Sequence, residues 1–222
     1  NVQALLPGDV TGRYSRIVLA VKAHHTEAAS LALTPHLTED GFVLSAQNGL
    51  NELVISKIVG VERTVGAFVN FGADWLGPGR ILFGNRGAVV IGELDGSKKD
   101  RTYEIHRLMQ VFEPQAVLTT NIWGYLWSKL AYGAMLFATA LTNDSMADNF
   151  ANPTRASLWI GLGREVIGLA HARGISPVGF NGFDPTVFAR EASEQEARSC
   201  IEGLAKFNRH SAKTHSGIWR DI

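Results

Sequence analysis

The chain has 222 residues, of which 45% are hydrophobic, so it is long enough to form one large or two small domains with their own cores. Lysine and arginine together number 21 and balance 21 acidic residues, which excludes the basic surface typical of proteins that bind nucleic acid or anionic membranes. The single cysteine excludes an internal disulfide framework and favours a reducing compartment, so we expect a cytoplasmic protein.

The sequence is not expected to contain a membrane span or a secretion signal. Its longest apolar runs, residues 17–21 and 131–138, are too short or too interrupted to cross a bilayer. The first eight residues lack the charged, apolar and small-residue regions of a signal peptide. We therefore expect the sequence to begin within a longer protein.

The first half of the chain alternates strand and helix signals. Residues 17–21 form a continuous, mostly β-branched apolar run, which is typical of a parallel strand covered on both faces. Helical spacing follows over residues 26–37, and a second strand is predicted over 41–46. A short helix over 52–59 and a strand over 64–69 continue the alternation, which indicates a doubly wound α/β domain.

Glycine and proline punctuate residues 72–93, which we interpret as strands that finish the sheet, with a turn at 77–79. An amphipathic helix is predicted over 98–112, and a last short strand over 116–118. Asn121 is then a suitable N-cap for the helix that follows.

Strand signals stop at this point, and the rest of the chain is predicted to be helical. Long helices are expected over residues 122–142, 155–173 and 193–208. The sequence therefore predicts a Rossmann-type α/β domain, residues 1–121, followed by an all-α domain, residues 122–222.

Lys129 stands out because it is the only charged residue between Ile122 and Asn143, in a helix that is apolar on nearly every side. Tyr125 and Tyr132 lie about one helical turn away and could orient an amine. Such a lysine is either a structural residue whose stem covers apolar surface while its head reaches water, or a functional acid with a lowered pKa.

Two polar residues follow predicted strands at the edge where open α/β sheets bind ligands. Lys22 closes the first strand, and it is either a solvated cation or a contact to phosphate or substrate. Asn48 follows the second strand and precedes Gly49. It is either a turn residue that tolerates a left-handed backbone or a ligand contact.

Several other residues and motifs are weaker candidates for a functional site. The sequence from Gly161 to Val166 superficially resembles a dinucleotide-binding fingerprint, but it lacks a third glycine in register and a preceding strand. The seven histidines lack the spacing of metal ligands, so no metal is expected. Cys200 is interpreted as a core residue, while Ser216 and Asp221 fit ordinary helix starts.

Taken together, the order and spacing of these segments resemble the ketopantoate (2-dehydropantoate) reductase family, in which an NADPH-binding Rossmann domain precedes a helical substrate domain. The likeness spans essentially the whole chain. It rests on Val21-Lys22-Ala23, Gln47-Asn48-Gly49, Gly72-Ala73, Gly77-Pro78-Gly79, Ile91-Gly92-Glu93, Asn121-Ile122-Trp123, Lys129-Leu130-Ala131, Lys213-Thr214-His215-Ser216 and Asp221.

The resemblance implies an oxidoreductase that transfers a hydride from NADPH to the C2 carbonyl of a 2-oxo acid. Lys129 would then be the general acid that protonates the developing alkoxide. Lys22 and Asn48 would contact the cofactor, and Asn48, Ser216 and Asp221 would bind substrate. The implied substrate is ketopantoate or a related compound, which corresponds to a role in pantothenate biosynthesis.

The chain also departs from the family pattern. The family places asparagines one turn and about two turns after the lysine, whereas this chain has Gly133 and then Leu136 or Phe137. A paralogue with a more apolar pocket is therefore one expectation. The resemblance further implies that the family's Gly-rich phosphate loop lies upstream of Asn1, and that its substrate-binding glutamate lies beyond Ile222.

The expected partner is a small 2-oxo acid rather than nucleic acid or a membrane. A catalytically inactive family member that acts as a binding or assembly module is the competing hypothesis. A homodimer is an open expectation, because one helix carries an apolar face formed by Leu158, Leu162 and Leu169.

Overall fold

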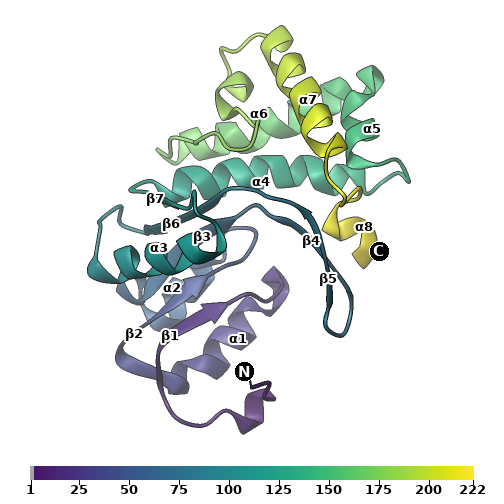
Figure 1. Ribbon diagram of the computed structural model, residues 1–222. Coiled ribbons are helices and arrows are strands. Elements are labelled where there is room, and N and C mark those ends of the chain that lie inside the picture. Colours follow the sequence, from purple (N-terminus) through teal and green to yellow (C-terminus); the bar gives the residue numbers. More distant parts are fainter. Residues whose placement is uncertain (1–2) are drawn as a thin grey trace. The chain divides into compact units, whose positions relative to one another are not determined.

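In a computed structural model, which describes residues 3–222, the chain forms two compact units (Figure 1). The first comprises the chain up to Val69 together with Val89–Ile122, and the second comprises Asn70–Ala88 together with Trp123–Ile222. The first unit is an α/β structure, and the second is helical apart from one β-hairpin. The predicted combination of a Rossmann-type part and a helical part is confirmed.

The α/β unit contains one mixed five-stranded sheet. Its elements are β1 (Tyr14–Leu19), α1 (Thr26–Leu33), β2 (Leu37–Ser45), α2 (Glu52–Val59), β3 (Thr64–Val69), β6 (Val89–Glu93), α3 (Asp100–Phe112) and β7 (Val117–Leu118). The strand order is β1-β2-β3-β6-β7; β1 to β3 are parallel, β6 is antiparallel to β3, and β7 is parallel to β6. α1 and α2 pack together on one face of the sheet, and α3 lies on the other (Figure 1).

The sheet is held together by strands that are buried on both faces. β3 and β6 are almost wholly buried, as their apolar sequences predict. Gly66 and Gly92 let residues 119–122 of the same unit approach the sheet closely. A Cβ atom at Gly66 would lie 2.8 Å from Cγ1 of Ile122, and one at Gly92 would lie 2.8 Å from the carbonyl oxygen of Thr119.

β1 differs from the sequence prediction. It was expected to be covered on both faces, but it is the edge strand of the described sheet, and the side chains of Tyr14 and Val18 are 43% and 58% exposed. The first helix also stops earlier than predicted, at Leu33. Pro35 follows in a short 3-10 turn, and because proline has no N–H to donate, the α-helix does not continue through it.

The prediction that residues 72–93 finish the sheet is wrong in part. Only β6 joins the sheet, whereas β4 (Gly72–Gly77) and β5 (Arg80–Asn85) form a separate antiparallel hairpin. The hairpin groups with the helical unit. Periodicity identifies such strands, but it does not identify the surface on which they pack.

Asn181 attaches the base of this hairpin to the helical unit. Its side-chain oxygen accepts hydrogen bonds from Nδ2 of Asn70 at 3.1 Å and from the backbone N–H of Ala88 at 2.9 Å. Its φ of 43° is the only positive value at a non-glycine residue within 3–222. Asparagine tolerates this left-handed backbone better than most residues, which suits it to the position.

The helical unit is built from α4 (Ile122–Thr139), α5 (Met146–Ala151), α6 (Ala156–Ala172), α7 (Glu194–Arg209) and α8 (Gly217–Asp221). α4, α6 and α7 confirm the three predicted helices, although α4 ends three residues early. α5 and α8 were not predicted. The core is aromatic, and neighbouring ring centroids lie 5.4 to 6.3 Å apart among Tyr132, Phe150, Phe180, Phe183 and Phe188.

The glycines that superficially resembled a dinucleotide fingerprint lie within α6. A Cβ atom at Gly163 would lie 2.5 Å from Cδ1 of Phe188 and 2.8 Å from Cε of Met135. This glycine therefore allows close helix packing. In the described part of the chain, no helix combines the length and apolarity that a membrane span requires.

Candidate active site

Lys22 and Asn48 lie at the same edge of the sheet, after the carboxyl ends of β1 and β2, which pair in parallel. Gln47 joins the two strand ends, because its Nε2 donates a hydrogen bond to the carbonyl oxygen of Val21 at 2.7 Å. Both Lys22 and Asn48 are exposed. The structure thus places these two predicted residues together on one surface.

A buried polar network fixes the turn that carries Asn48. Nε2 of Gln47 also donates to Oγ1 of Thr26 at 2.9 Å, and this hydroxyl donates to Oδ1 of Asn51 at 3.0 Å. Nδ2 of Asn51 then donates to the carbonyl oxygen of Asn48 at 2.7 Å. Gly49 completes the turn with a φ of 101°. Such a satisfied network specifies one backbone conformation.

Glu52, the first residue of α2, lies next to this network and is fully buried. Burial raises the pKa of its carboxyl group to about 7, while its own backbone N–H and the Ser45 hydroxyl act in the opposite direction. Neither carboxyl oxygen makes a hydrogen bond of standard geometry within residues 3–222, so the contact with Ser45 is weak. The sequence did not indicate this residue, because a glutamate in the first turn of a helix is common.

Lys129 lies in the middle of α4, in an apolar environment. Leu126 and Tyr132, each about one turn away, are 2% and 5% exposed. Desolvation lowers the pKa of the Lys129 ammonium from 10.5 to about 7. The residue nevertheless keeps an intermediate exposure, which is compatible with access for a small molecule. A lysine ammonium with a pKa near 7 can donate a proton at neutral pH, so Lys129 is a candidate acid.

The hydroxyl of Tyr132, one of the two phenols near Lys129, binds a residue of α7. Nδ2 of Asn208 donates to the Tyr132 hydroxyl at 3.0 Å, and burial raises the pKa of this phenol to about 12. Nδ2 of Asn208 also lies 2.8 Å from the carbonyl oxygen of Leu204. Tyr132 and Asn208 therefore hold α4 against α7, and no sequence motif had indicated Asn208.

Ser216 and Asp221 bound the short helix α8. Ser216 occupies the N-cap position and is 4% exposed, but its hydroxyl makes no capping hydrogen bond. Its Oγ has no hydrogen-bond partner within residues 3–222. Asp221 is exposed at the end of the helix. The buried hydroxyls of Ser30, Thr38 and Ser128 likewise lack partners in the described residues, so this property alone does not single out Ser216.

The five predicted site residues are thus divided between the two units. Lys22 and Asn48 belong to the α/β unit, and Lys129, Ser216 and Asp221 belong to the helical unit.

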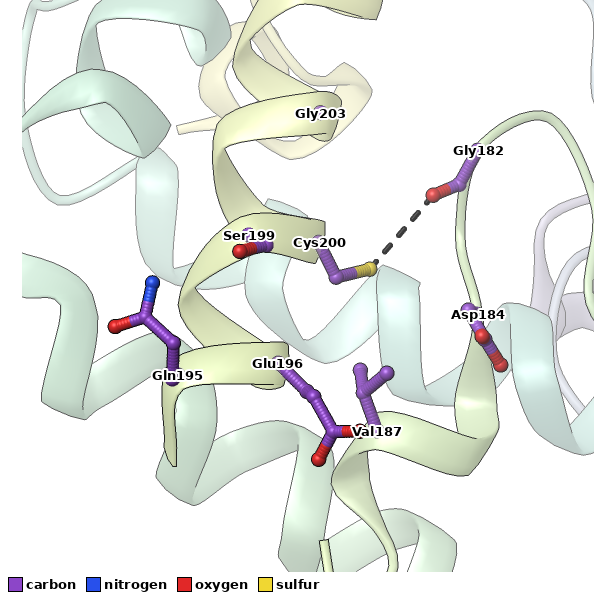
Figure 2. Close-up of a pocket in the computed structure, with 8 residues that line it drawn as sticks. All are labelled: Gly182, Asp184, Val187, Gln195, Glu196, Ser199, Cys200 and Gly203. Carbon is purple, nitrogen blue, oxygen red and sulfur yellow. Dashed lines mark hydrogen bonds between the residues drawn. The ribbon is translucent and has the colours of Figure 1, made fainter. Parts of the chain in front are cut away.

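The one hollow described outside these residues lacks a reactive group. A shallow hollow beside α7 contains Cys200, whose thiol pKa is raised by burial, so the thiol is a poor nucleophile (Figure 2). Within residues 3–222, no group of three or more His, Cys, Asp or Glu side chains could hold a metal ion. The hollow is lined by Gly182, Asp184, Val187, Gln195, Glu196, Ser199, Cys200 and Gly203.

Solved structures share this fold. Over 95% of its length the chain matches the crystal structure of 2-dehydropantoate 2-reductase from Geobacter metallireducens, with a TM-score of 0.75, 19% identity and 65% of that chain covered. It also matches a ternary structure of D-mandelate dehydrogenase with NADH and anilino(oxo)acetate, with a TM-score of 0.70, 20% identity, and coverage of 90% of this chain and 63% of that one.

Sequence comparison finds relatives in one family of enzymes. Residues 3–96 match the model described as Ketopantoate reductase PanE/ApbA. The chain is 24% identical over 206 residues to 2-dehydropantoate 2-reductase of Archaeoglobus fulgidus, covering 92% of this chain and 62% of that relative. It is 30% identical over 114 residues to the Pyrococcus horikoshii enzyme of the same name, covering 51% and 37%. The predicted resemblance to the ketopantoate reductase family is confirmed, and the chain spans less than two thirds of the length of these relatives.

Proposed function

We propose that the protein reduces a 2-oxo acid to the 2-hydroxy acid with a nicotinamide cofactor, and that Lys129 is the general acid. The observation that carries this proposal is a lysine in an apolar helix whose pKa is lowered to about 7. The names of the relatives support it, since both are 2-dehydropantoate 2-reductases. The neighbour solved with NADH and an oxo acid supports the same class of reaction.

The cofactor we propose is NADPH, which supplies a hydride to C2 of the substrate when bound. Lys22 and Asn48 would hold part of it. They fit this role because an exposed cation and an exposed amide follow adjacent parallel strands, at the edge where α/β sheets bind nucleotides. The network from Gln47 to Asn51 would keep Asn48 in a fixed orientation.

Lys129 would complete the reaction at the carbonyl oxygen. As C2 accepts the hydride, negative charge grows on this oxygen, and the Lys129 ammonium donates a proton to it and becomes a neutral amine. A pKa near 7 suits this step because the group is then substantially protonated at neutral pH and still a good donor. Before the transfer, its positive charge stabilises the developing alkoxide.

The substrate we propose is ketopantoate or a related 2-oxo acid, with Asn48, Ser216 and Asp221 as its polar contacts. The role of Ser216 rests on the family resemblance of residues 213–216, and its buried hydroxyl is left available for a ligand. A Cβ atom at Gly133, one turn after Lys129, would meet no heavy atom within 4 Å, and Phe137 is 60% exposed. The helix therefore has free space at Gly133 and an exposed apolar side chain at Phe137, both after Lys129 in the sequence. These features favour a 2-oxo acid with a bulky apolar side chain.

Steady-state kinetics of the full-length protein would test the reaction. We expect oxidation of NADPH with at least one acid from a panel that includes ketopantoate and phenylglyoxylate, and kcat should fall as the pH rises above about 7. Lys129→Ala should lower kcat on the order of 10²- to 10⁴-fold. Lys206→Ala, which removes an exposed lysine of α7, should leave kcat unchanged. Absence of turnover with every acid would refute the proposed function.

We further propose a homodimer. A neighbouring structure from Staphylococcus aureus is described as a dimeric ketopantoate reductase, with a TM-score of 0.68 and 22% identity. In this chain, Leu158 and Leu169 of α6 are 44% and 52% exposed. Sedimentation of the full-length protein tests this proposal, and a monomer at all concentrations would contradict it.

A further inference from the structure

We propose that Asp74 is a positioning residue that holds the segment carrying Ser216. The substrate role of Ser216 rests on the proposed function, whereas the attachment of the segment to Asp74 rests on contacts within the helical unit. Asp74 lies on β4 of the hairpin, far along the sequence from the segment that it contacts.

The Asp74 carboxylate forms ion pairs with one residue before Ser216 and one residue after it. Nζ of Lys213 lies 2.8 Å from Oδ1 of Asp74, and it also donates to the carbonyl oxygen of Ala73 at 3.0 Å. Nη2 of Arg220 lies 2.8 Å from Oδ2 of Asp74, an ion pair whose angles fall outside hydrogen-bond geometry. Because Lys213 precedes Ser216 and Arg220 follows it, the two contacts restrain the serine from both sides.

The backbone next to Lys213 lies against the other strand of the hairpin. The hydroxyl of Ser211 donates to Oδ1 of Asn85 at 2.8 Å, and the N–H of Ala212 donates to the carbonyl oxygen of Gly84 at 3.1 Å. A Cβ atom at Gly84 would lie 2.7 Å from Cβ of Lys213, so only glycine allows this approach. Several contacts therefore attach residues 211–220 to the hairpin.

The burial of Asp74 contrasts with that of its neighbours. Its side chain is 5% exposed, while Trp75 and Leu76 are 72% and 49% exposed. A buried carboxylate is costly unless it is paired, and the pairs that compensate it add orientation more than net stability. Restraint of the segment on both sides would keep the buried Ser216 hydroxyl in one place for the proposed substrate contact.

Hydrogen exchange measures the attachment without any assay of activity. In Asp74→Asn, which keeps the shape of the side chain and removes its charge, we expect the amides of residues 213–221 to exchange roughly tenfold faster. Asp74→Glu should restore part of the protection. The control is Glu194→Gln, which breaks the ion pair with Arg198 at the far end of α7 and should leave this segment unchanged. Unchanged exchange in Asp74→Asn would overturn the proposal.

Kinetics of the full-length protein then test the positioning role. Asp74→Asn should raise the KM for the 2-oxo acid roughly tenfold while kcat changes little, because Lys129 and the cofactor contacts stay intact. Faster exchange with an unchanged KM would overturn the positioning role and leave a purely structural contact. If the wild-type protein turns over no 2-oxo acid, the proposed function fails, whereas the exchange data still decide whether Asp74 holds the segment.

Discussion

At Lys129, the desolvation that suits proton donation also affects folding. The pKa of its ammonium is about 7 in the folded chain and near 10.5 when exposed, so the folded state binds fewer protons between these values. Its contribution to stability is therefore most unfavourable below pH 7 and improves as the pH rises toward 10.5.

We expect Lys129→Met to raise the free energy of unfolding at pH 6 by up to about 5 kcal/mol, because each unit of pKa shift corresponds to about 1.4 kcal/mol. The gain should shrink as the pH is raised to 9. Urea unfolding at the two pH values measures the effect. A structural lysine whose head reaches water would show no gain at either pH.

The Glu52 carboxyl group makes the free energy of unfolding depend on pH in the opposite direction. Its pKa is raised from 4.5 to about 7, so the folded state binds the extra proton, and the stability that this provides is present below pH 4.5 and lost as the pH rises through 7. We expect Glu52→Gln to raise the free energy of unfolding at pH 8 by about 3 kcal/mol and to change it little at pH 5. Thermal or urea unfolding tests this, with the exposed Glu39→Gln as a control that should change neither value.

At the scale of the elements, α6 offers a matched pair of glycines. Gly163→Ala should destabilise the helical unit by about 1 to 3 kcal/mol, because the new Cβ atom meets Phe188 and Met135. Gly161→Ala, where no heavy atom lies within 4 Å, should instead stabilise it by up to about 1 kcal/mol through helix propensity. A loss of stability in both variants would contradict the packing argument.

The long elements could be predicted from sequence because their local signals agree. α7 begins at a Ser193 cap whose hydroxyl accepts from the N–H of Glu196, and the glutamate side chain binds the serine in return. α5 and α8 have six and five residues, too few for periodicity to show. The hairpin was recognised as strands, but its packing partner depends on residues far away in the sequence, such as Asn181, which is 111 positions from Asn70.

At the scale of the whole molecule, the sequence indicated part of the candidate site. Lys129 was found because a charge in an apolar helix is unusual, and Lys22 and Asn48 because they follow predicted parallel strands. Asp74 and Glu52 have no such local signal. Glu52 is distinguished by its burial, and Asp74 by ion pairs with residues that are distant in the sequence. Both properties depend on the tertiary structure, so neither residue could be recognised from spacing alone.

The exposed side of β1 affects how the 222-residue chain behaves at high concentration. As the edge strand of the described sheet, β1 presents backbone groups beside the exposed side chains of Tyr14 and Val18, which is a template for strand pairing between molecules. We expect this chain to self-associate through β1, and Val18→Lys to reduce that association in light scattering. If the variant aggregates as fast as the parent, another surface is responsible. An edge strand of the described sheet would then limit the solubility of the chain.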